Sequence, residues 1–196
     1  MRITAYTDGS ACVGYPKLGG FGVYIKTPDK NIKIRKGYCN TKTGRMELMA
    51  VIICMRSIQN KGLELTIRSD SQYVCNTVNE WIDHWRSIGY LGKANIDLLK
   101  QLDIEISKFT YRPKLIHIKG HQDVTDQHTL GNNIADQLAN YKTQSSYEVD
   151  LPLSDLASFE MNDYYELDDK LYYKKEVDRL KEASDNYDLK NEIKNG

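Results

Sequence analysis

The sequence has few cysteines and no long apolar run, and these shortages exclude several classes of protein. The four cysteines show no Cys-x-x-Cys spacing, so a zinc site is not expected. No apolar stretch approaches the roughly 18 residues of a membrane-spanning helix, and residues 1–4 lack the apolar character of a secretory signal. We therefore expect free thiols, no membrane partner, and a cytoplasmic or other intracellular location; the thiols are Cys12, Cys39, Cys54 and Cys75.

The sequence also lacks net charge, but its charges are unevenly distributed along the chain. Residues 1–144 hold 20 Lys and Arg against 13 Asp and Glu, a balance of +7, whereas residues 145–196 hold 7 against 14, a balance of −7. A basic body is typical of proteins that bind polyanions. The acidic remainder would serve as a solubilising extension, compete with a bound polyanion, or dock a protein partner.

The change in charge coincides with a change in sequence pattern. We expect one domain over residues 1–146, followed by an acidic C-terminal extension over residues 147–196 that is partly helical or disordered. Within the extension, Leu171, Val177 and Leu180 favour an amphipathic helix from Asp168 to about Ala183.

Alternation of apolar and polar residues predicts strands at 2–8, 21–25, 32–38, 63–67 and 115–118. Helical spacing or a nearly continuous apolar character predicts helices at 45–60, 72–81, 95–109 and 130–141. The first three strands are joined by short turns, whereas the fourth follows a helix, which indicates a parallel pairing. These patterns predict an α/β fold with a mixed sheet.

Four acidic residues stand out by position: Asp8, Glu47, Asp70 and Asp136. Each has an ordinary structural interpretation when taken alone. Asp8 would lie in a turn after the first strand, Glu47 in the first turn of a helix, where the dipole favours an acid. Asp70 would act like a cap after the fourth strand, and Asp136 would pair with a basic residue.

Taken together, the four acids favour a metal site. Asp8 and Asp70 each follow a strand expected near the sheet centre, and ligands bind at the carboxyl ends of such strands. Several converging carboxylates repel one another and are relieved by hard divalent cations such as Mg²⁺ or Mn²⁺. Two such ions about 3.5–4 Å apart form a phosphoryl-transfer site. With the basic body, this pattern indicates a metal-dependent enzyme that acts on a nucleic-acid phosphate.

Five segments resemble, in order and spacing, the successive motifs of type 1 ribonuclease H. They are Thr7-Asp8-Gly9-Ser10, Arg45-Met46-Glu47-Leu48-Met49-Ala50, Ser69-Asp70-Ser71-Gln72-Tyr73-Val74, Lys119-Gly120-His121 and Gly131-Asn132-Asn133-Ile134-Ala135-Asp136. The resemblance implies the ribonuclease H-like fold, a five-stranded mixed sheet flanked by helices. It implies endonucleolytic cleavage of the RNA strand of RNA/DNA hybrids by a two-metal mechanism, with 5′-phosphate and 3′-hydroxyl products.

The same resemblance assigns roles to individual residues. It implies that two Mg²⁺ ions, or Mn²⁺ as a substitute, are held by Asp8, Glu47, Asp70 and Asp136. His121 would help to move protons or to release product. The residues implied to contact the hybrid are Gly9, Ser10, Thr43, Gln72, Trp85 and Asn132.

The sequence departs from the family pattern beside these motifs. Thr43-Gly44 stand where asparagines are common, and Tyr15 replaces a common asparagine in the first loop. The segment 85–93 is short and only mildly basic, so we expect weaker, more salt-sensitive substrate binding. Two other functions stay open: a catalytically inactive hybrid-binding module, and a subunit of a reverse-transcription or replication assembly. We expect a monomer without a separate N-terminal hybrid-binding domain.

Overall fold

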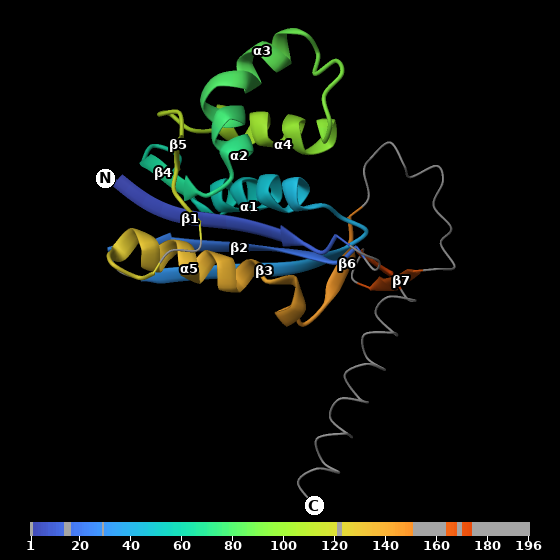
Figure 1. Cartoon of the computed structure of the whole chain (residues 1–196). Coiled ribbons are helices and arrows are strands. Elements are labelled where there is room, and N and C mark those ends of the chain that lie inside the picture. Colours follow the sequence, from blue (N-terminus) through green and yellow to red (C-terminus); the bar gives the residue numbers. More distant parts are fainter. Residues whose placement is uncertain are drawn as a thin grey trace, which may run out of the picture.

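A six-stranded mixed sheet lies at the centre of the computed structural model, which describes residues 2–13, 17–28, 30–120 and 123–150 and the backbone of residues 164–167 and 170–173. The strand order is β5-β4-β1-β2-β3-β6, seen in Figure 1. The strands are β1 (Arg2–Ala11), β2 (Gly19–Lys26), β3 (Asn31–Cys39), β4 (Glu64–Ser69), β5 (Lys114–His117) and β6 (Tyr147–Val149). The predicted mixed sheet is confirmed.

Strand pairing follows from the connections between the strands. The short turns make β1, β2 and β3 an antiparallel meander, and the helical crossovers make β4 parallel to β1 and β5 parallel to β4. The sequence predicts five strands, and the structure adds a sixth, because β6 pairs in parallel with β3. The sheet therefore continues into residues that we assigned to the acidic extension.

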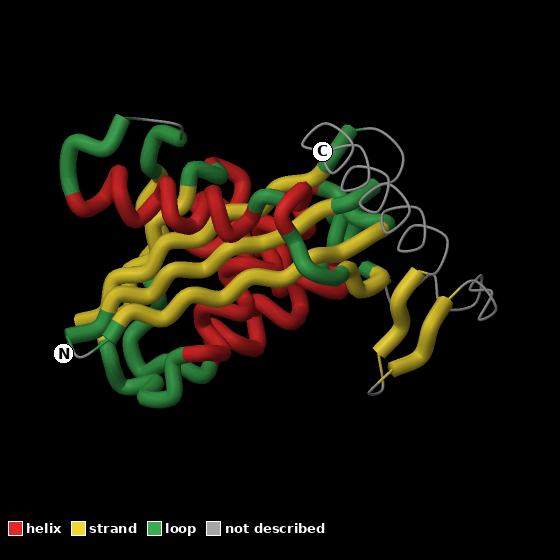
Figure 2. Tube along the Cα trace, turned by 90° about the horizontal axis from the view of Figure 1, so that it is seen from below, coloured by secondary structure: helices red, strands yellow, loops and turns green. Residues whose placement is uncertain are grey.

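Helices cover both faces of the sheet. On one face, α1 (Thr43–Ser57) packs against β1 and β2, and α4 (Ile96–Ser107) packs on α1. On the opposite face, α5 (Gln127–Ala139) packs against β1, β2 and β3. Figure 1 shows this layering, and Figure 2 views the sheet from the side of α5.

The helix predicted over residues 72–81 is interrupted. It consists of α2 (Gln72–Asn76) and a π-helix, η1 (Thr77–Trp81), which runs directly into α3 (Ile82–Ser87). A π-helical turn adds one residue to the helical repeat, and the hydroxyl of Thr77 donates to the carbonyl oxygen of Tyr73 at 2.8 Å. The indole rings of Trp81 and Trp85 lie 5.3 Å apart beyond this turn.

Helix α5 begins three residues before its predicted start. Asp126 caps it by accepting hydrogen bonds from the backbone of His128 and Thr129, each at 2.8 Å, and Thr129 completes a capping box. The helix ends at Ala139 rather than at the predicted Tyr141, and a 3-10 turn, η2 (Tyr141–Thr143), follows.

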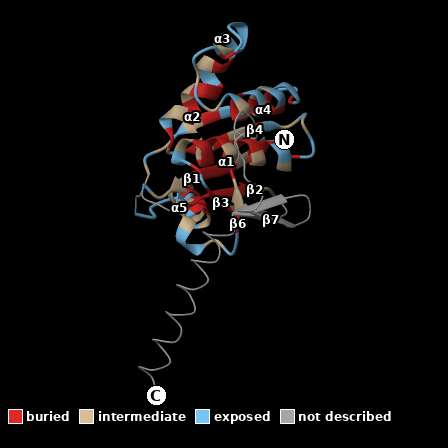
Figure 3. Ribbon diagram, turned by 90° about the vertical axis from the view of Figure 1, so that its right-hand side faces the viewer, coloured by how far each residue is buried: buried red, intermediate tan, exposed pale blue. Residues whose placement is uncertain are grey.

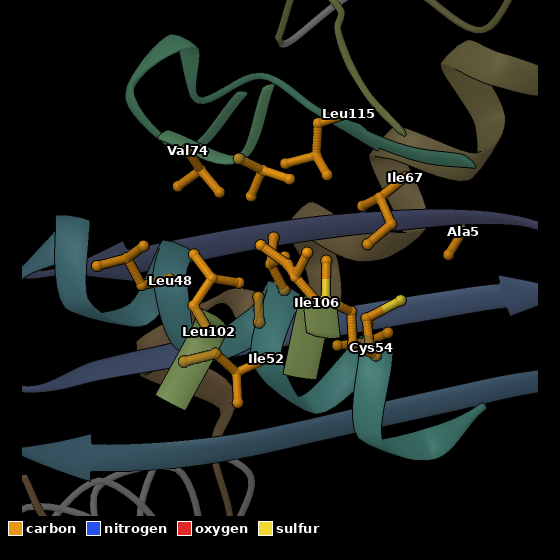
Figure 4. Close-up of a cluster of buried hydrophobic side chains, with 14 of the residues drawn as sticks. Ala5, Leu48, Ile52, Cys54, Ile67, Val74, Leu102, Ile106 and Leu115 are labelled. Carbon is orange, nitrogen blue, oxygen red and sulfur yellow. The ribbon is translucent and has the colours of Figure 1, made fainter. Parts of the chain in front are cut away.

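The main hydrophobic core lies between the sheet and α1. Figure 3 shows buried residues concentrated in this layer, and Figure 4 shows side chains from α1, α4, β1, β4 and β5 meeting there. Ile52 of α1, Ile67 of β4 and Leu102 of α4 have no measurable exposure. The nearly continuous apolar character of α1 is thus explained by burial on most sides, as the sequence predicts.

Part of the acidic extension forms a hairpin. Strands β7 (Tyr164–Leu167) and β8 (Lys170–Tyr173) pair antiparallel as a separate two-stranded sheet. The helix predicted from Asp168 is therefore wrong at residues 170–173, and its other positions lie outside the described residues. None of the described helices is long and apolar enough to cross a membrane.

Candidate active site

Asp8 and Asp70 reach neighbouring positions through the register of β1 and β4. The last pair of this parallel ladder is Thr7 with Ser69, so each aspartate is the next residue on its strand or just past it. Neighbouring strands lie about 4.8 Å apart. We expected Asp8 to end its strand, but β1 continues to Ala11, where it pairs with β2 alone. The two carboxylates thus meet where the parallel pairing stops, at the centre of the sheet.

Gly9 brings the first residues of α1 onto β1. A Cβ at this position would lie 2.5 Å from the carbonyl carbon of Met46 and 2.8 Å from the Cα of Glu47. Only glycine permits such an approach. The backbone of Glu47 therefore lies against β1 at the residue after Asp8, and the charge of Asp70 acts on its side chain. Since α1 begins at Thr43, Glu47 is in the second turn, and the first-turn interpretation is wrong.

Ser71 fixes the orientation of Glu47. Its hydroxyl donates to Oε2 of Glu47 at 2.6 Å and accepts from the backbone N–H of Val74 at 3.4 Å. The cap of α2 is therefore Ser71 rather than Asp70, whose ordinary interpretation was a cap-like role. The hydrogen bond to Glu47 was not predicted from the sequence.

Asp136 approaches Asp8 from the opposite helix. The neighbours of Asp8 on the same face of β1 both contact α5: the hydroxyl of Tyr6 lies 2.8 Å from Nδ1 of His128, and the hydroxyl of Ser10 donates to the carbonyl oxygen of Ala139 at 2.6 Å. Side chains two apart on a strand share a face, so Asp8 points toward α5. The charge of Asp136 accordingly acts on Asp8.

The carboxylates perturb one another because they are crowded and partly buried. Burial, followed by the charge of Asp70, raises the pKa of Asp8 to about 7, although the N–H of Gly9 donates to its Oδ1 at 2.8 Å and lowers it. Asp136 raises the pKa of Asp8 further. Burial also raises the pKa of Glu47, with Asp70 adding to the shift and the Ser71 hydroxyl opposing it. Such a site is stabilised by a proton or a cation.

The chemistry of this donor set suits a divalent metal ion. Carboxylate oxygens are the ligands that Mg²⁺ and Mn²⁺ prefer, and an incoming cation would relieve the repulsion at Asp8. Among the described residues, no three His, Cys, Asp or Glu side chains are yet arranged as a complete metal centre. The carboxylates would therefore adjust their rotamers around an ion.

The predicted His121 lies outside the described residues, but the chain that leads to it does not. A Cβ on Gly120 would overlap Oδ2 of Asp70 and lie 3.3 Å from its Cγ. Nε2 of His117 lies 3.1 Å from the carbonyl oxygen of Asp70. The loop after β5 thus passes directly against the carboxylate site.

The residues predicted to contact a hybrid fall into two groups. Thr43 and Gln72 are exposed at the starts of α1 and α2, close to Glu47 and Asp70 in the chain. Trp85 is half-buried against Trp81, with the ammonium of Lys93 5.0 Å from its ring centre. These three side chains remain available to a ligand.

The other predicted contact residues are enclosed. Gly9 is buried under α1, and the hydroxyl of Ser10 is engaged by Ala139 and by the N–H of Tyr141 at 3.2 Å. Asn132 is only 3% exposed, and its Oδ1 has no hydrogen-bond partner among the residues that the structure describes. In this arrangement, Gly9 and Ser10 would offer backbone groups to a ligand rather than side chains.

A buried ionic network supports α1 next to Glu47. The guanidinium of Arg45 donates to both carboxylate oxygens of Asp97 at 2.9 and 2.7 Å and to those of Asp150 at 2.6 and 2.7 Å. Thr41 also donates to Asp150, at 2.5 Å. Burial acts to raise the pKa of Asp97, but the hydrogen bonds and charge of Arg45 hold this pKa below its usual value. Sequence reasoning missed Asp97 and Asp150; the one available signal was an arginine two residues before Glu47.

Comparison with known proteins identifies consistent relatives. The RNase H family matches residues 1–144. The ribonuclease H of Aeromonas salmonicida (strain A449) is 36% identical over 125 residues, which cover 61% of this chain and 79% of that protein.

Solved structures agree with this match. The protease-reverse transcriptase of Prototype Foamy Virus is 26% identical with a TM-score of 0.63, over 70% of this chain but only 20% of the viral one. The PFV RNase H domain alone is 25% identical with a TM-score of 0.57, over 70% of this chain and 91% of that domain.

Proposed function

Because this chain belongs to the RNase H family, we propose that it is an endoribonuclease that hydrolyses the RNA strand of RNA/DNA hybrids. The products would be 5′-phosphate and 3′-hydroxyl ends. The observation that carries this proposal is the placement of Asp8 and Asp70 side by side at the sheet centre, with Glu47 and Asp136 brought to them from opposite faces.

The family depends on divalent metal ions, and we propose that this chain uses two Mg²⁺ ions, with Mn²⁺ as a substitute. Asp8, Glu47, Asp70 and Asp136 would hold them. When bound, the ions would supply an activated water and charge stabilisation for the departing 3′ oxygen. The raised pKa of Asp8 supports its role as a metal ligand, because a carboxylate that is repelled by its neighbours is stabilised by a nearby cation.

The protein groups around the carboxylates would orient them for the reaction. The N–H of Gly9 directs one oxygen of Asp8, and the hydroxyl of Ser71 directs Glu47. As the water oxygen bonds to phosphorus, the water gives up a proton to solvent, the bond from phosphorus to the 3′ oxygen breaks, and that oxygen takes up a proton. We propose that His121 moves this proton or assists product release, since the loop leading to it contacts Asp70.

Recognition of the hybrid would use the surface around this site. We propose contacts from Thr43, Gln72 and Trp85 through side chains, and from Gly9 and Ser10 through the backbone. Asn132 would contribute only if its enclosed amide became accessible. Contacts with 2′-hydroxyl groups would distinguish RNA from DNA.

A cleavage assay tests the proposal. The full chain is incubated with an end-labelled RNA/DNA hybrid and Mg²⁺, and Asp70→Asn is compared with Asp83→Asn. Asp83 is an exposed aspartate on α3 that pairs with surface arginines, so its loss should leave cleavage within about twofold. Asp70→Asn should abolish it. Cleavage that survives in Asp70→Asn, or that is absent from the wild type, would overturn the assignment.

We further propose that the chain acts as a monomer within the cell, because one chain supplies all four carboxylates and its buried cysteines Cys54 and Cys75 are free thiols. The catalytic domain, predicted over residues 1–146, would extend to Asp150, because β6 pairs with β3 and Asp150 pairs with Arg45. The acidic residues beyond this domain would dock a protein partner by charge.

A further inference from the structure

In the described part of the chain, α5 covers only one half of its face of the sheet. This helix packs on β1, β2 and β3, so the same face of β4 and β5 faces outward. Burial alternates along β4, with Leu65, Ile67 and Ser69 turned into the core. Arg68 and Lys114 lie on the outward face.

A hollow of about 470 Å³ lies on this open face. Its lining contains four basic side chains and a single acidic one: Arg2, Arg68, Arg112, Lys114 and Glu64. The hollow runs along β4 from Glu64 to Arg68, two residues before Asp70. It is separate from the carboxylate cluster, which draws on none of these residues.

Some of these basic groups are occupied and others are available. Arg2 forms an exposed ion pair with Glu64 at 2.9 Å, and Arg112 donates to Asp83 at 2.6 Å. Among the described residues, by contrast, the buried Nε of Arg68 has no hydrogen-bond partner, and the side chain lines the hollow. A guanidinium whose donors are not all paired attracts a nearby anion. The hollow therefore favours an anionic ligand.

The rim adds an aromatic surface. Tyr111 lines the hollow and is 57% exposed. A positive groove beside an exposed aromatic ring is the combination that binds single-stranded nucleic acid, because phosphates contact the cations while a base stacks on the ring. A hollow of this volume accommodates nucleotide-sized groups, whereas a duplex is too wide to enter it.

We propose that this hollow is a second nucleic-acid site, which binds a single-stranded segment through phosphate contacts with Arg68 and Lys114 and base stacking on Tyr111. Its occupant would be an unpaired strand, such as an overhang of the substrate or a released product. The proposal rests on the proposed function only for the source of that strand; the binding itself does not require catalysis.

Direct binding tests the site. Fluorescence anisotropy of a labelled oligothymidylate is measured with the full chain at low salt and with divalent metals chelated, so that cleavage plays no part. Lys114→Gln should weaken binding about three- to tenfold and reduce the slope of log affinity against log salt by about 0.7. Lys100→Gln is the matched control, because Lys100 is an exposed lysine on α4, which packs on the other side of the sheet.

Tyrosine variants test the stacking independently. Tyr111→Ala should weaken binding about fivefold or more, whereas Tyr111→Phe, which keeps the ring, should bind like the wild type. Cleavage of a blunt-ended hybrid should stay within about twofold in Lys114→Gln and Tyr111→Ala, since neither residue lies in the carboxylate site.

Three results would overturn the proposal. The first is equal binding by the wild type, Lys114→Gln and Tyr111→Ala. The second is the absence of oligonucleotide binding by the wild type at low salt, which is the result expected if the acidic residues 151–196 occupy the hollow instead. The third is an equal loss in Lys100→Gln, which would indicate nonspecific charge attraction. None of these results depends on whether the hybrid is cleaved.

Discussion

Asp8 is the most enclosed of the four carboxylate residues, with 8% of its surface exposed, and its ionisation links stability to pH. The raised pKa, about 7, means that the folded protein holds this proton more tightly than the unfolded chain, whose value is 3.8. The stabilising effect of the proton is complete below the unfolded pKa and is lost as pH rises through the folded pKa.

The expected result is a fall in the free energy of unfolding of the metal-free protein between about pH 5 and pH 8, by at most on the order of 3 kcal/mol. Urea denaturation in the presence of chelator measures it. Asp8→Asn should lack this part of the pH dependence, and added Mg²⁺ should reduce it in the wild type. Identical pH profiles for the wild type and Asp8→Asn would contradict the interpretation.

Gly9 is the second decisive residue, because it sets the distance between β1 and α1. Gly9→Ala should destabilise the protein by about 2 kcal/mol or more, since the new methyl group would meet backbone atoms that cannot move aside. It should also reduce hybrid cleavage by displacing Glu47. Thermal melting and the cleavage assay measure the two effects.

Gly44→Ala is the matched control for this variant. Gly44 lies at the start of α1, and the nearest atom to an added Cβ is 4.0 Å away, on Tyr73. Alanine in a helix is favoured over glycine by about 0.5–1 kcal/mol, so this variant should be as stable as the wild type or more so. Equal behaviour of the two variants would show that the approach of α1 does not limit the site.

At the residue scale, the sequence predicted which residues form the candidate site better than it predicted the contacts between them. Asp8 and Asp70 were predicted because each ends an apolar strand, Glu47 because it precedes an apolar helical run, and Asp136 because it interrupts a helix beside core residues. Their roles as ligands stay a prediction. The hydrogen bond from Ser71 to Glu47 could not be predicted, because it depends on the distance between two helices.

At the scale of elements, the buried network around Arg45 ties three segments together: α1, the start of α4 and the residue after β6. Asp150→Ala would leave Arg45 with Asp97 alone and Thr41 without its acceptor. Removing one partner of a buried charge is costly, and we expect a loss of about 2–4 kcal/mol in the free energy of unfolding. Chemical denaturation measures it.

Glu64→Ala provides the comparison, because Glu64 pairs with Arg2 at the surface, with side chains 54% and 74% exposed. Loss of this ion pair should lower the free energy of unfolding by less than about 1 kcal/mol. If Asp150→Ala is no more destabilising than Glu64→Ala, the residues after β6 are not part of the stable fold.

The elements up to residue 150 were largely predictable, with two instructive exceptions. Alternation located β1 to β5, and apolar periodicity located α1, α4 and α5. Strand β6 has only three residues, too few to show alternation, and its partner β3 is more than 100 positions away in the chain. The π-helix at Thr77–Trp81 was also missed, because one extra residue in a turn barely disturbs the apolar period.

At the scale of the whole molecule, the division of charge governs how the substrate is held. A body with an excess of 7 positive charges attracts a hybrid, while the extension with an equal negative excess opposes it. We expect the KM for an RNA/DNA hybrid to rise steeply with salt, because affinity falls with a logarithmic slope of about 0.9 for each phosphate contacted. Steady-state cleavage over a series of salt concentrations measures this dependence.

The value of kcat at saturating hybrid serves as the internal control and should change little, because screening acts on association rather than on bond breaking. A KM that does not vary with salt would contradict the expected electrostatic binding.

The ion pair between Arg45 and Asp150 has a consequence for synthesis on the ribosome. The chain emerges from its N-terminus, so Arg45 stays without this partner until more than 100 further residues have been made. Strand β3 likewise lacks its partner β6, and Asp8 lacks Asp136, until these later residues have been synthesised. Because most contacts of the site join residues far apart in the sequence, the site cannot assemble while the chain is still short. A nascent chain released before residue 150 should therefore carry every motif of the enzyme and yet lack its finished architecture, so that nuclease activity appears only when translation of the domain is complete.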